Sequence, residues 1–138
     1  MSVDLALPAN VSCPLNELVL VDDDALTIEI VSWILKKGTH DSHLFTNTGA
    51  ALSYLKLNTP RLLIVDFYMP EMTGLDFISD LYESTNLEHT KIYLCSAVRP
   101  PRDSVERFAD MNVDMLDKQL ICDRSKLTEL LDRHLAES

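Results

Sequence analysis

Short apolar runs alternate with longer segments of helical period along this chain, and no other feature constrains the fold as strongly. The runs suit strands buried on both faces, as in a parallel sheet. The predicted strands are 17–22, 41–46, 61–66, 91–97 and 113–117, and the predicted helices are 25–38, 49–58, 75–84, 99–110 and 123–137. Because parallel strands need right-handed crossovers, the pattern predicts an α/β fold, with a doubly wound five-stranded parallel sheet and five flanking helices.

The apolar positions of the predicted helices indicate which faces turn inward. In the first helix we expect Leu26, Ile30, Trp33 and Ile34 to face the sheet. The other helical residues expected in the core are Ala51, Leu52, Leu55, Phe77, Leu127, Leu130 and Leu131. Thr48 is a candidate N-cap for the second helix.

Length and composition are those of one folded domain. The chain has 138 residues, of which 46% are hydrophobic and 25% charged, and its formal net charge is −10. A surface this negative repels a phosphate backbone, so direct nucleic-acid binding is not expected. No apolar run reaches the roughly 18 residues of a membrane span, so membrane insertion is not expected either.

The number and spacing of the cysteines indicate the redox compartment, and the first residues of the chain indicate where the domain begins. Cys13, Cys95 and Cys122 are odd in number and widely spaced, which favours a reducing cytoplasm over a disulfide framework or a zinc site. His40 and His43 fall on opposite faces of a predicted strand, and we expect both at the surface. Residues 1–16 contain two prolines and no sustained period, so they are predicted as an extension that precedes one domain at 17–136.

Polar residues follow the predicted strands at the edge where sheets of this kind bind ligands. With the strand order 2-1-3-4-5, this edge gathers Asp22, Asp23, Asp66, Ser96 and Lys118. Crowded carboxylates repel one another and raise one another's pKa unless a cation lies among them. Few protein ligands, all of them oxygen, are the pattern for Mg²⁺, which we predict as the cofactor.

Each of these residues also has an ordinary structural explanation. The run from Asp22 to Asp24 fits a solvated turn in which Asp24 caps the next helix. Lys118 fits a surface lysine, and Ser96 fits a strand-end hydroxyl bonded to the backbone. Their joint placement at successive strand ends is what favours a functional site.

Four motifs occur in an order and at a spacing similar to those of a known family. They are LVLVDDD (18–24), LLIVDFYMPEMTGLDF (62–77), IYLCSA (92–97) and DMLDK (114–118). Over residues 17–136 the chain resembles the receiver domain of bacterial two-component response regulators, in the chemotaxis-regulator-like superfamily. The resemblance implies a flavodoxin-like fold and a phosphoprotein that signals rather than an enzyme, which at most catalyses its own phosphorylation and dephosphorylation.

The resemblance assigns the acidic residues. Asp66 is implied as the phosphoacceptor. Asp23 and Asp66 are implied as Mg²⁺ ligands together with the backbone carbonyl of Tyr68, and Asp22 as a ligand through a water. A carboxylate that attacks a phosphoryl group forms an acyl phosphate, and the dispersed charge of that transition state needs a metal and a cation nearby.

The resemblance also assigns the remaining polar residues, and it has two departures. Ser96 is implied to hydrogen-bond a phosphoryl oxygen and Lys118 to pair with the phosphoryl group. The family usually has a proline after that lysine, joined by a cis bond, but this chain has Gln119, for which a trans bond is expected. Three residues before the lysine, where the family often has an aromatic relay residue, this chain has Met115.

These inferences together predict a stand-alone receiver. It would take a phosphoryl group from a histidine kinase or a phosphotransfer protein onto Asp66 and signal to a downstream effector protein through protein contacts. The alternatives are a receiver fragment of a larger regulator, an interaction scaffold that works without phosphorylation, and a phosphatase or flavin protein on the same sheet. The last pair fits poorly, because an aspartyl phosphatase is expected to use a D-x-D arrangement after its first strand and a flavin phosphate site needs hydroxyls and amides.

Overall fold

The structure is a computed structural model that describes residues 14–136, and it contains five strands and six helices in that range. The strands are β1 (Leu15–Val21), β2 (Asp41–Phe45), β3 (Pro60–Asp66), β4 (Lys91–Ser96) and β5 (Asp114–Asp117). The helices are α1 (Ala25–Lys36), α2 (Thr48–Leu57), α3 (Gly74–Ser84), α4 (Arg102–Asp110), α5 (Lys118–Ile121) and α6 (Arg124–His134). The predicted count of five helices missed α5, a single turn directly after β5, which is too short to show a period.

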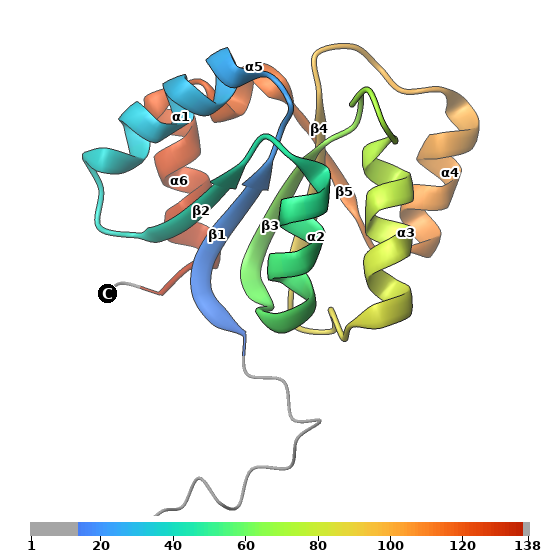
Figure 1. Ribbon diagram of the computed structural model, residues 1–138. Coiled ribbons are helices and arrows are strands. Elements are labelled where there is room, and N and C mark those ends of the chain that lie inside the picture. Colours follow the sequence, from blue (N-terminus) through green and yellow to red (C-terminus); the bar gives the residue numbers. More distant parts are fainter. Residues whose placement is uncertain (1–13, 137–138) are drawn as a thin grey trace, which may run out of the picture.

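The strands form one parallel sheet in the order β2-β1-β3-β4-β5, which confirms the predicted fold (Figure 1). Strand order reverses at β1, whose neighbours are β2 and β3. The carboxyl ends of β1 and β3 therefore lie side by side, and the register pairs Val21 with Val65. On the other side of β3, Asp66 is paired with Cys95 of β4.

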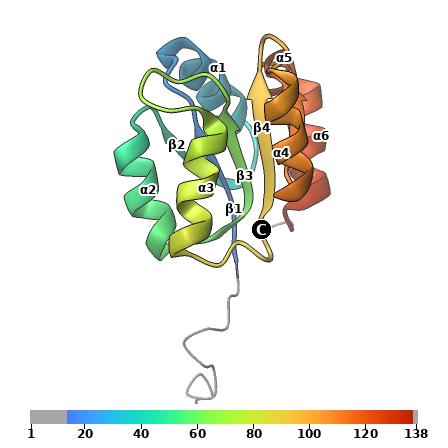
Figure 2. The same ribbon diagram turned by 90° about the vertical axis from the view of Figure 1, so that its right-hand side faces the viewer.

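Helices cover both faces of the sheet. Helices α2, α3 and α4 lie on one face and α1, α5 and α6 on the other (Figures 1 and 2). Alternate strand residues enter two separate cores, so Val19 and Leu63 pack toward α2 and α3 while Leu18 and Leu62 pack toward α1 and α6. Phe77 fills the first core without any exposed surface, as predicted.

The predicted inner face of α1 is wrong for two of its four residues, whereas Ile30 and Ile34 are partly buried. Leu26 and Trp33 are 63% and 65% exposed, whereas Thr27 and Val31 are buried against the sheet. The start of the helix explains the rotation, because Asp24 caps it and also accepts a hydrogen bond from the Thr27 hydroxyl at 3.0 Å, which turns Thr27 inward. The apolar residues of α1 are spread around the helix, so the period alone did not decide between the two faces.

The other helical predictions hold, except for one cap. The buried residues of α2 and α6 are Ala51, Leu55, Leu127, Leu130 and Leu131, and Leu52 is partly buried. The N-cap of α2 is Asn47, whose side chain accepts a hydrogen bond from the Ala50 amide at 2.8 Å. Thr48 is instead the first helical residue, and its hydroxyl donates to Glu71 at 3.1 Å.

The two histidines differ from each other. The His43 side chain is 47% exposed, as predicted. His40 is not a surface residue, because its side chain is only 9% exposed and its Nε2 lies 3.0 Å from Asp132 of α6. The contact bridges residues 92 positions apart, which a sequence pattern does not reveal.

The chain ends and the backbone complete the description. Strand β1 begins at Leu15, and the Asn16 side chain exchanges two hydrogen bonds with the backbone of Ala136 after α6. Residues 1–13 of the expected extension lie outside the described residues. Within residues 14–136 no peptide bond is cis, which agrees with the expectation for Gln119. None of the helices in this range combines the length and the apolar character that crossing a bilayer requires.

Candidate functional site

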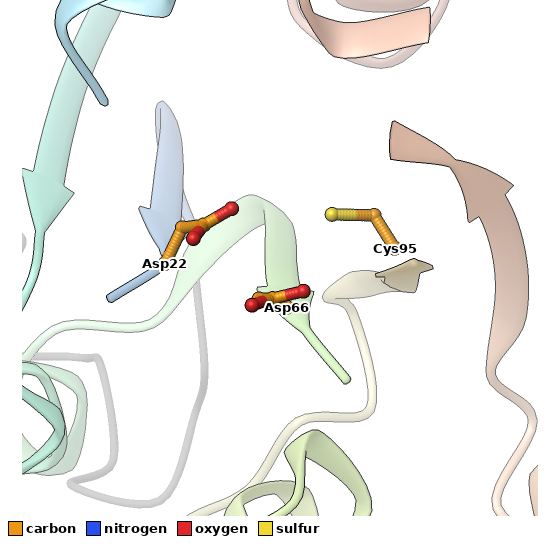
Figure 3. A group of neighbouring side chains, drawn as sticks. All are labelled: Asp22, Asp66 and Cys95. Atoms are coloured by element: carbon orange, nitrogen blue, oxygen red, sulfur yellow. The ribbon is translucent and has the colours of Figure 1, made fainter. Parts of the chain in front are cut away.

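Two buried carboxylates stand at the ends of the two central strands (Figure 3). Asp66 is the last residue of β3 and is 4% exposed, and Asp22 directly follows β1 and has no exposed surface. The backbone amide of Asp24 donates to Asp22 Oδ1 at 2.9 Å, which fixes this carboxylate at the start of the turn. Asp23 directly follows Asp22 and is exposed, and its charge contributes to raising the pKa of Asp66.

Lys118 brings a positive charge to these acids. Its Nζ lies 3.1 Å from Asp22 Oδ2 and 3.7 Å from Asp66 Oδ2. Its position follows from the short helix α5, which begins at Lys118 and is capped by Asp117, whose side chain accepts a hydrogen bond from the Gln119 amide. The strand-end positions of all three charged residues are therefore as predicted, and the structure brings them into contact.

Burial and like charge give Asp66 an unusual ionisation. Removal from water and the neighbouring charge of Asp22 raise the pKa of Asp66 to about 7, against a partial lowering by Lys118. Burial also raises the pKa of Asp22. Although burial alone would favour the neutral amine, the hydrogen bond and charge of Asp22 raise the pKa of Lys118. When both carboxylates are ionised, their negative charge exceeds what the single charge of Lys118 compensates.

Ser96 reaches the same edge of the sheet but makes its hydrogen bonds elsewhere. It is the last residue of β4 and is buried. Its hydroxyl donates to the Val98 carbonyl and accepts from the Val98 amide at 3.2 Å. The structural alternative of a strand-end hydroxyl bonded to the backbone thus describes Ser96 in this state.

The loop after Asp66 is held close to the strand ends. The Phe67 amide donates to the Cys95 carbonyl and the Gly74 amide to the Phe67 carbonyl, both at 2.8 Å, and Tyr68 forms a bridge with Thr73. A Cβ added to Gly74 would lie 2.6 Å from the Asp66 carbonyl oxygen. Only a residue without a side chain allows this approach, so Gly74 contributes to the position of the Tyr68 backbone.

The donor set fits a hard divalent cation. Asp22 Oδ2 is buried and receives no hydrogen bond from the described residues, although Lys118 lies nearby. Asp22, Asp23 and Asp66 offer carboxylate oxygens, and a cation among them would relieve their mutual repulsion.

One residue of the site was missed by the sequence prediction. The Sγ of Cys95 and one carboxylate oxygen each of Asp22 and Asp66 all lie within 4.8 Å of one another (Figure 3). Cys95 comes one position before Ser96, and strand alternation turns the two side chains to opposite faces. What places Cys95 in the site is its pairing with Asp66 across β3 and β4. A sequence pattern does not give the register of these two strands, so it could not have identified Cys95.

Comparison with known proteins decides the family. The family model of the response regulator receiver domain matches residues 18–132 of this chain. The chain belongs to the response regulator receiver family. Receiver domains are signalling domains of two-component systems and generally have an acidic pocket, and this chain has an acidic cluster that includes Asp22 and Asp66.

Known receivers resemble this chain at modest identity. The two-component response regulator ORR3 of rice (Oryza sativa) is 26% identical over 119 residues, which are 80% of this chain and 91% of that protein. The chemotaxis protein CheY4 of Vibrio cholerae has a TM-score of 0.73 at 22% identity, covering 88% of this chain and 99% of that one. The Mn²⁺-bound form of response regulator Rcp1 has a TM-score of 0.65 at 18% identity, covering 86% of this chain and 90% of that one. At such identities the two solved structures show the shared fold.

Proposed function

We propose that this receiver accepts a phosphoryl group on Asp66 from a histidine kinase or phosphotransfer protein and then signals to an effector protein through a changed surface. The observation that carries the proposal is the buried Asp66 carboxylate, which lies close to Asp22 and to the ammonium of Lys118 and whose pKa the charge of Asp23 also raises. An ion pair with a purely structural role would need only one acid beside Lys118, whereas three acids follow the strands at this edge of the sheet.

The geometry supports nucleophilic attack by Asp66. A carboxylate oxygen of Asp66 forms the new bond to phosphorus while the bond from phosphorus to the donor breaks, and the electron pair of that bond leaves with the donor. Lys118, at 3.7 Å, supplies a charge that neutralises the phosphoryl oxygens as they gather around Asp66. The product is an acyl phosphate that remains on the protein.

Mg²⁺ is the cofactor that the acids suit. Asp23 and Asp66 would hold it with the backbone carbonyl of Tyr68, and Asp22 would act through a water. When bound, the cation offsets the negative charge of the acids and of the phosphoryl group. The Mn²⁺-bound Rcp1 structure supports a divalent cation in a receiver of this fold.

Because the pKa of Asp66 is raised, a bound cation would also help to ionise this carboxylate. With a pKa of about 7, a large share of Asp66 carries a proton near neutral pH and is then a poor nucleophile. A divalent cation favours the ionised carboxylate, so cation binding and nucleophile activation would be coupled.

Ser96 links the phosphoryl group to the surface. For its hydroxyl to donate to a phosphoryl oxygen, it must release the Val98 carbonyl. Val98 is 61% exposed, so a change in its loop alters the surface that a partner meets. We place this action in the cytoplasm.

Intact-protein mass spectrometry after incubation with acetyl phosphate and Mg²⁺ tests the proposal. We expect one added phosphoryl group on the wild type, removable with hydroxylamine as an acyl phosphate is, and none on Asp66→Asn. Asp76→Asn, which changes an exposed acid in the first turn of α3, is the matched control and should still be modified. A wild type that stays unmodified, or Asp66→Asn that gains a hydroxylamine-labile group, would favour a scaffold that works without phosphorylation or a different acceptor.

A further inference from the structure

Cys95 places a sulfur beside the acids of the site. It has no exposed surface and is paired with Asp66 across β3 and β4, so the two side chains leave the sheet on the same face. Figure 3 shows the sulfur turned toward the two carboxylates. One oxygen each of Asp22 and Asp66 and the Cys95 Sγ all lie within 4.8 Å of one another, a span that the ligands of a single metal ion can have.

The same three donors already surround a cation. Lys118 Nζ lies 3.1 Å from Asp22 Oδ2 and 3.7 Å from Asp66 Oδ2, and its charge also acts on the Cys95 thiol. This position differs from the expected Mg²⁺ position, which uses Asp23 and the Tyr68 backbone in place of the thiol.

A second observation points to a ligand at this place. Asp22 Oδ2 is fully buried and receives no hydrogen bond from the described residues: the Lys118 ammonium forms an ion pair with it at 3.1 Å but donates its hydrogen bond to Asp22 Oδ1 at 3.3 Å. Buried carboxylate oxygens are normally hydrogen-bonded, so this atom keeps an unused acceptor position that a metal ion could fill in place of the ammonium. An acidic cluster or a single thiol would not carry the argument without it.

We propose that a thiophilic divalent cation of the Zn²⁺ class binds Asp22, Asp66 and Cys95 in place of the Lys118 ammonium. The metal–sulfur bond uses the electron pair of the S–H bond, whose proton passes to solvent, while Lys118 swings outward as a solvated cation. Thiolate ligands favour Zn²⁺, Co²⁺ and Cd²⁺, whereas Mg²⁺ takes oxygen ligands, so one pocket offers two alternative metal positions.

The two positions exclude each other, because both use Asp66. A soft cation on Asp66 ties up the carboxylate oxygen needed for attack and displaces the lysine that pairs with the phosphoryl group. Binding would therefore hold the receiver in an unphosphorylated state. This consequence rests on the proposed function, whereas the metal position itself does not.

Co²⁺ is the probe, because a thiolate bound to Co²⁺ produces a charge-transfer absorption band in the near ultraviolet. The test protein is Cys13→Ser with Cys122→Ser, which keeps Cys95 as its one thiol. We expect one equivalent of Co²⁺ to give the band, and Zn²⁺ to abolish it by competition. Adding Cys95→Ala, or the better-filling Cys95→Val, should remove the band while circular dichroism stays unchanged. A test protein without the band, or a band that persists in both Cys95 variants, would overturn the proposal.

A second measurement separates this proposal from the proposed function. With Mg²⁺ and acetyl phosphate present, Zn²⁺ should slow phosphorylation of the test protein by about tenfold or more and leave its Cys95→Val variant within about twofold. Equal inhibition of both proteins would contradict the blocking role. If no protein is phosphorylated even without Zn²⁺, the proposed function fails, and the cobalt band still decides the metal site.

Discussion

The two halves of the strand-end site differ in how far they are built before any phosphoryl group is present. At the ends of β1 and β3, Asp22 and Asp66 are buried and fixed next to Lys118. At the end of β4, Ser96 is bonded to its own loop through Val98, and that loop is exposed. The acidic half is therefore ready for a cation, whereas the Ser96 half must change its hydrogen bonds to take part.

The position of each half in the sheet explains the difference. Strands β1 and β3 are central, and Leu62 to Asp66 are buried without interruption. Strand β5 is a four-residue edge strand with no buried residue, and its Met115 is 37% exposed. Charge that is buried in a rigid region keeps its geometry, and a loop next to a short edge strand can move at little cost. Each prediction below would break or sharpen this contrast.

Gly74→Ala should have the largest effect on the acidic half. The added Cβ would meet the Asp66 carbonyl oxygen and Leu94 Cδ2 at 2.6 Å, and neither buried group can move away freely. We expect a loss of about 1–3 kcal/mol of unfolding free energy, or roughly 4 °C of Tm per kcal/mol, together with weaker Mg²⁺ binding. Gly38→Ala is the control, since its Cβ would lie 3.7 Å from the nearest atom. Equal melting temperatures for the two variants would show that the loop is not tightly held.

Asp66→Asn should stabilise the protein at high pH, because the charge of Asp66 opposes folding. Its pKa is about 7 in the fold and near 3.8 when unfolded, so the folded state binds the proton more tightly. The destabilisation is complete above pH 7 and fades as pH falls toward 4. In the absence of divalent cations we expect a gain on the order of 1–2 kcal/mol at pH 8 that shrinks by pH 5. Thermal melts of both proteins across this range, with and without Mg²⁺, provide the check. A difference in melting temperature between the two proteins that widens toward low pH would contradict the raised pKa of Asp66.

Asp23→Ala should weaken Mg²⁺ binding without unfolding the protein. Asp23 is exposed, so its removal costs little packing and lowers the repulsion on Asp66. We expect affinity to fall by about tenfold or more, near 1.4 kcal/mol. Trp33 is 65% exposed on the outer side of α1, so backbone chemical shifts near Asp66 are a better readout than its fluorescence. Unchanged affinity would place the metal away from Asp23.

Ser96→Ala should have the smallest effect on the unmodified protein. It removes the hydrogen bonds to Val98 in an exposed loop, with an expected loss of about 1 kcal/mol or less. Mg²⁺ affinity should not change, because the hydroxyl is hydrogen-bonded to the Val98 backbone. If the variant binds Mg²⁺ more weakly than Asp23→Ala does, the two halves are not independent.

The fold could be predicted from the sequence because a regular alternation of strands and helices is compatible with few topologies. Five apolar runs separated by helical segments require parallel strands, and the order places Asp22 and Asp66 together. The face of α1 could not be predicted in the same way. Apolar residues surround that helix, and the Asp24 cap with Thr27 decided the rotation.

Some features of the site could likewise be predicted from the sequence, and others could not. The identity and edge position of Asp22, Asp66 and Lys118 follow from strand ends, which sequence patterns locate well. The Ser96 hydrogen bonds depend on a loop conformation, and the approach of Cys95 to Asp66 depends on register between two strands. Neither feature has a local sequence signal, so both required the structure.

Backbone chemical shifts, recorded before and after Mg²⁺ and then acetyl phosphate, test the central contrast most directly. We predict that Mg²⁺ alone shifts the amides of Asp23, Phe67 and Tyr68 and leaves that of Val98 in place. Phosphorylation of Asp66 should then shift Val98 strongly, as Ser96 exchanges its carbonyl partner for a phosphoryl oxygen. A Val98 amide that moves fully with Mg²⁺ alone, or that stays unchanged in the phosphorylated protein, would contradict a preformed acidic half and a Ser96 half that rearranges.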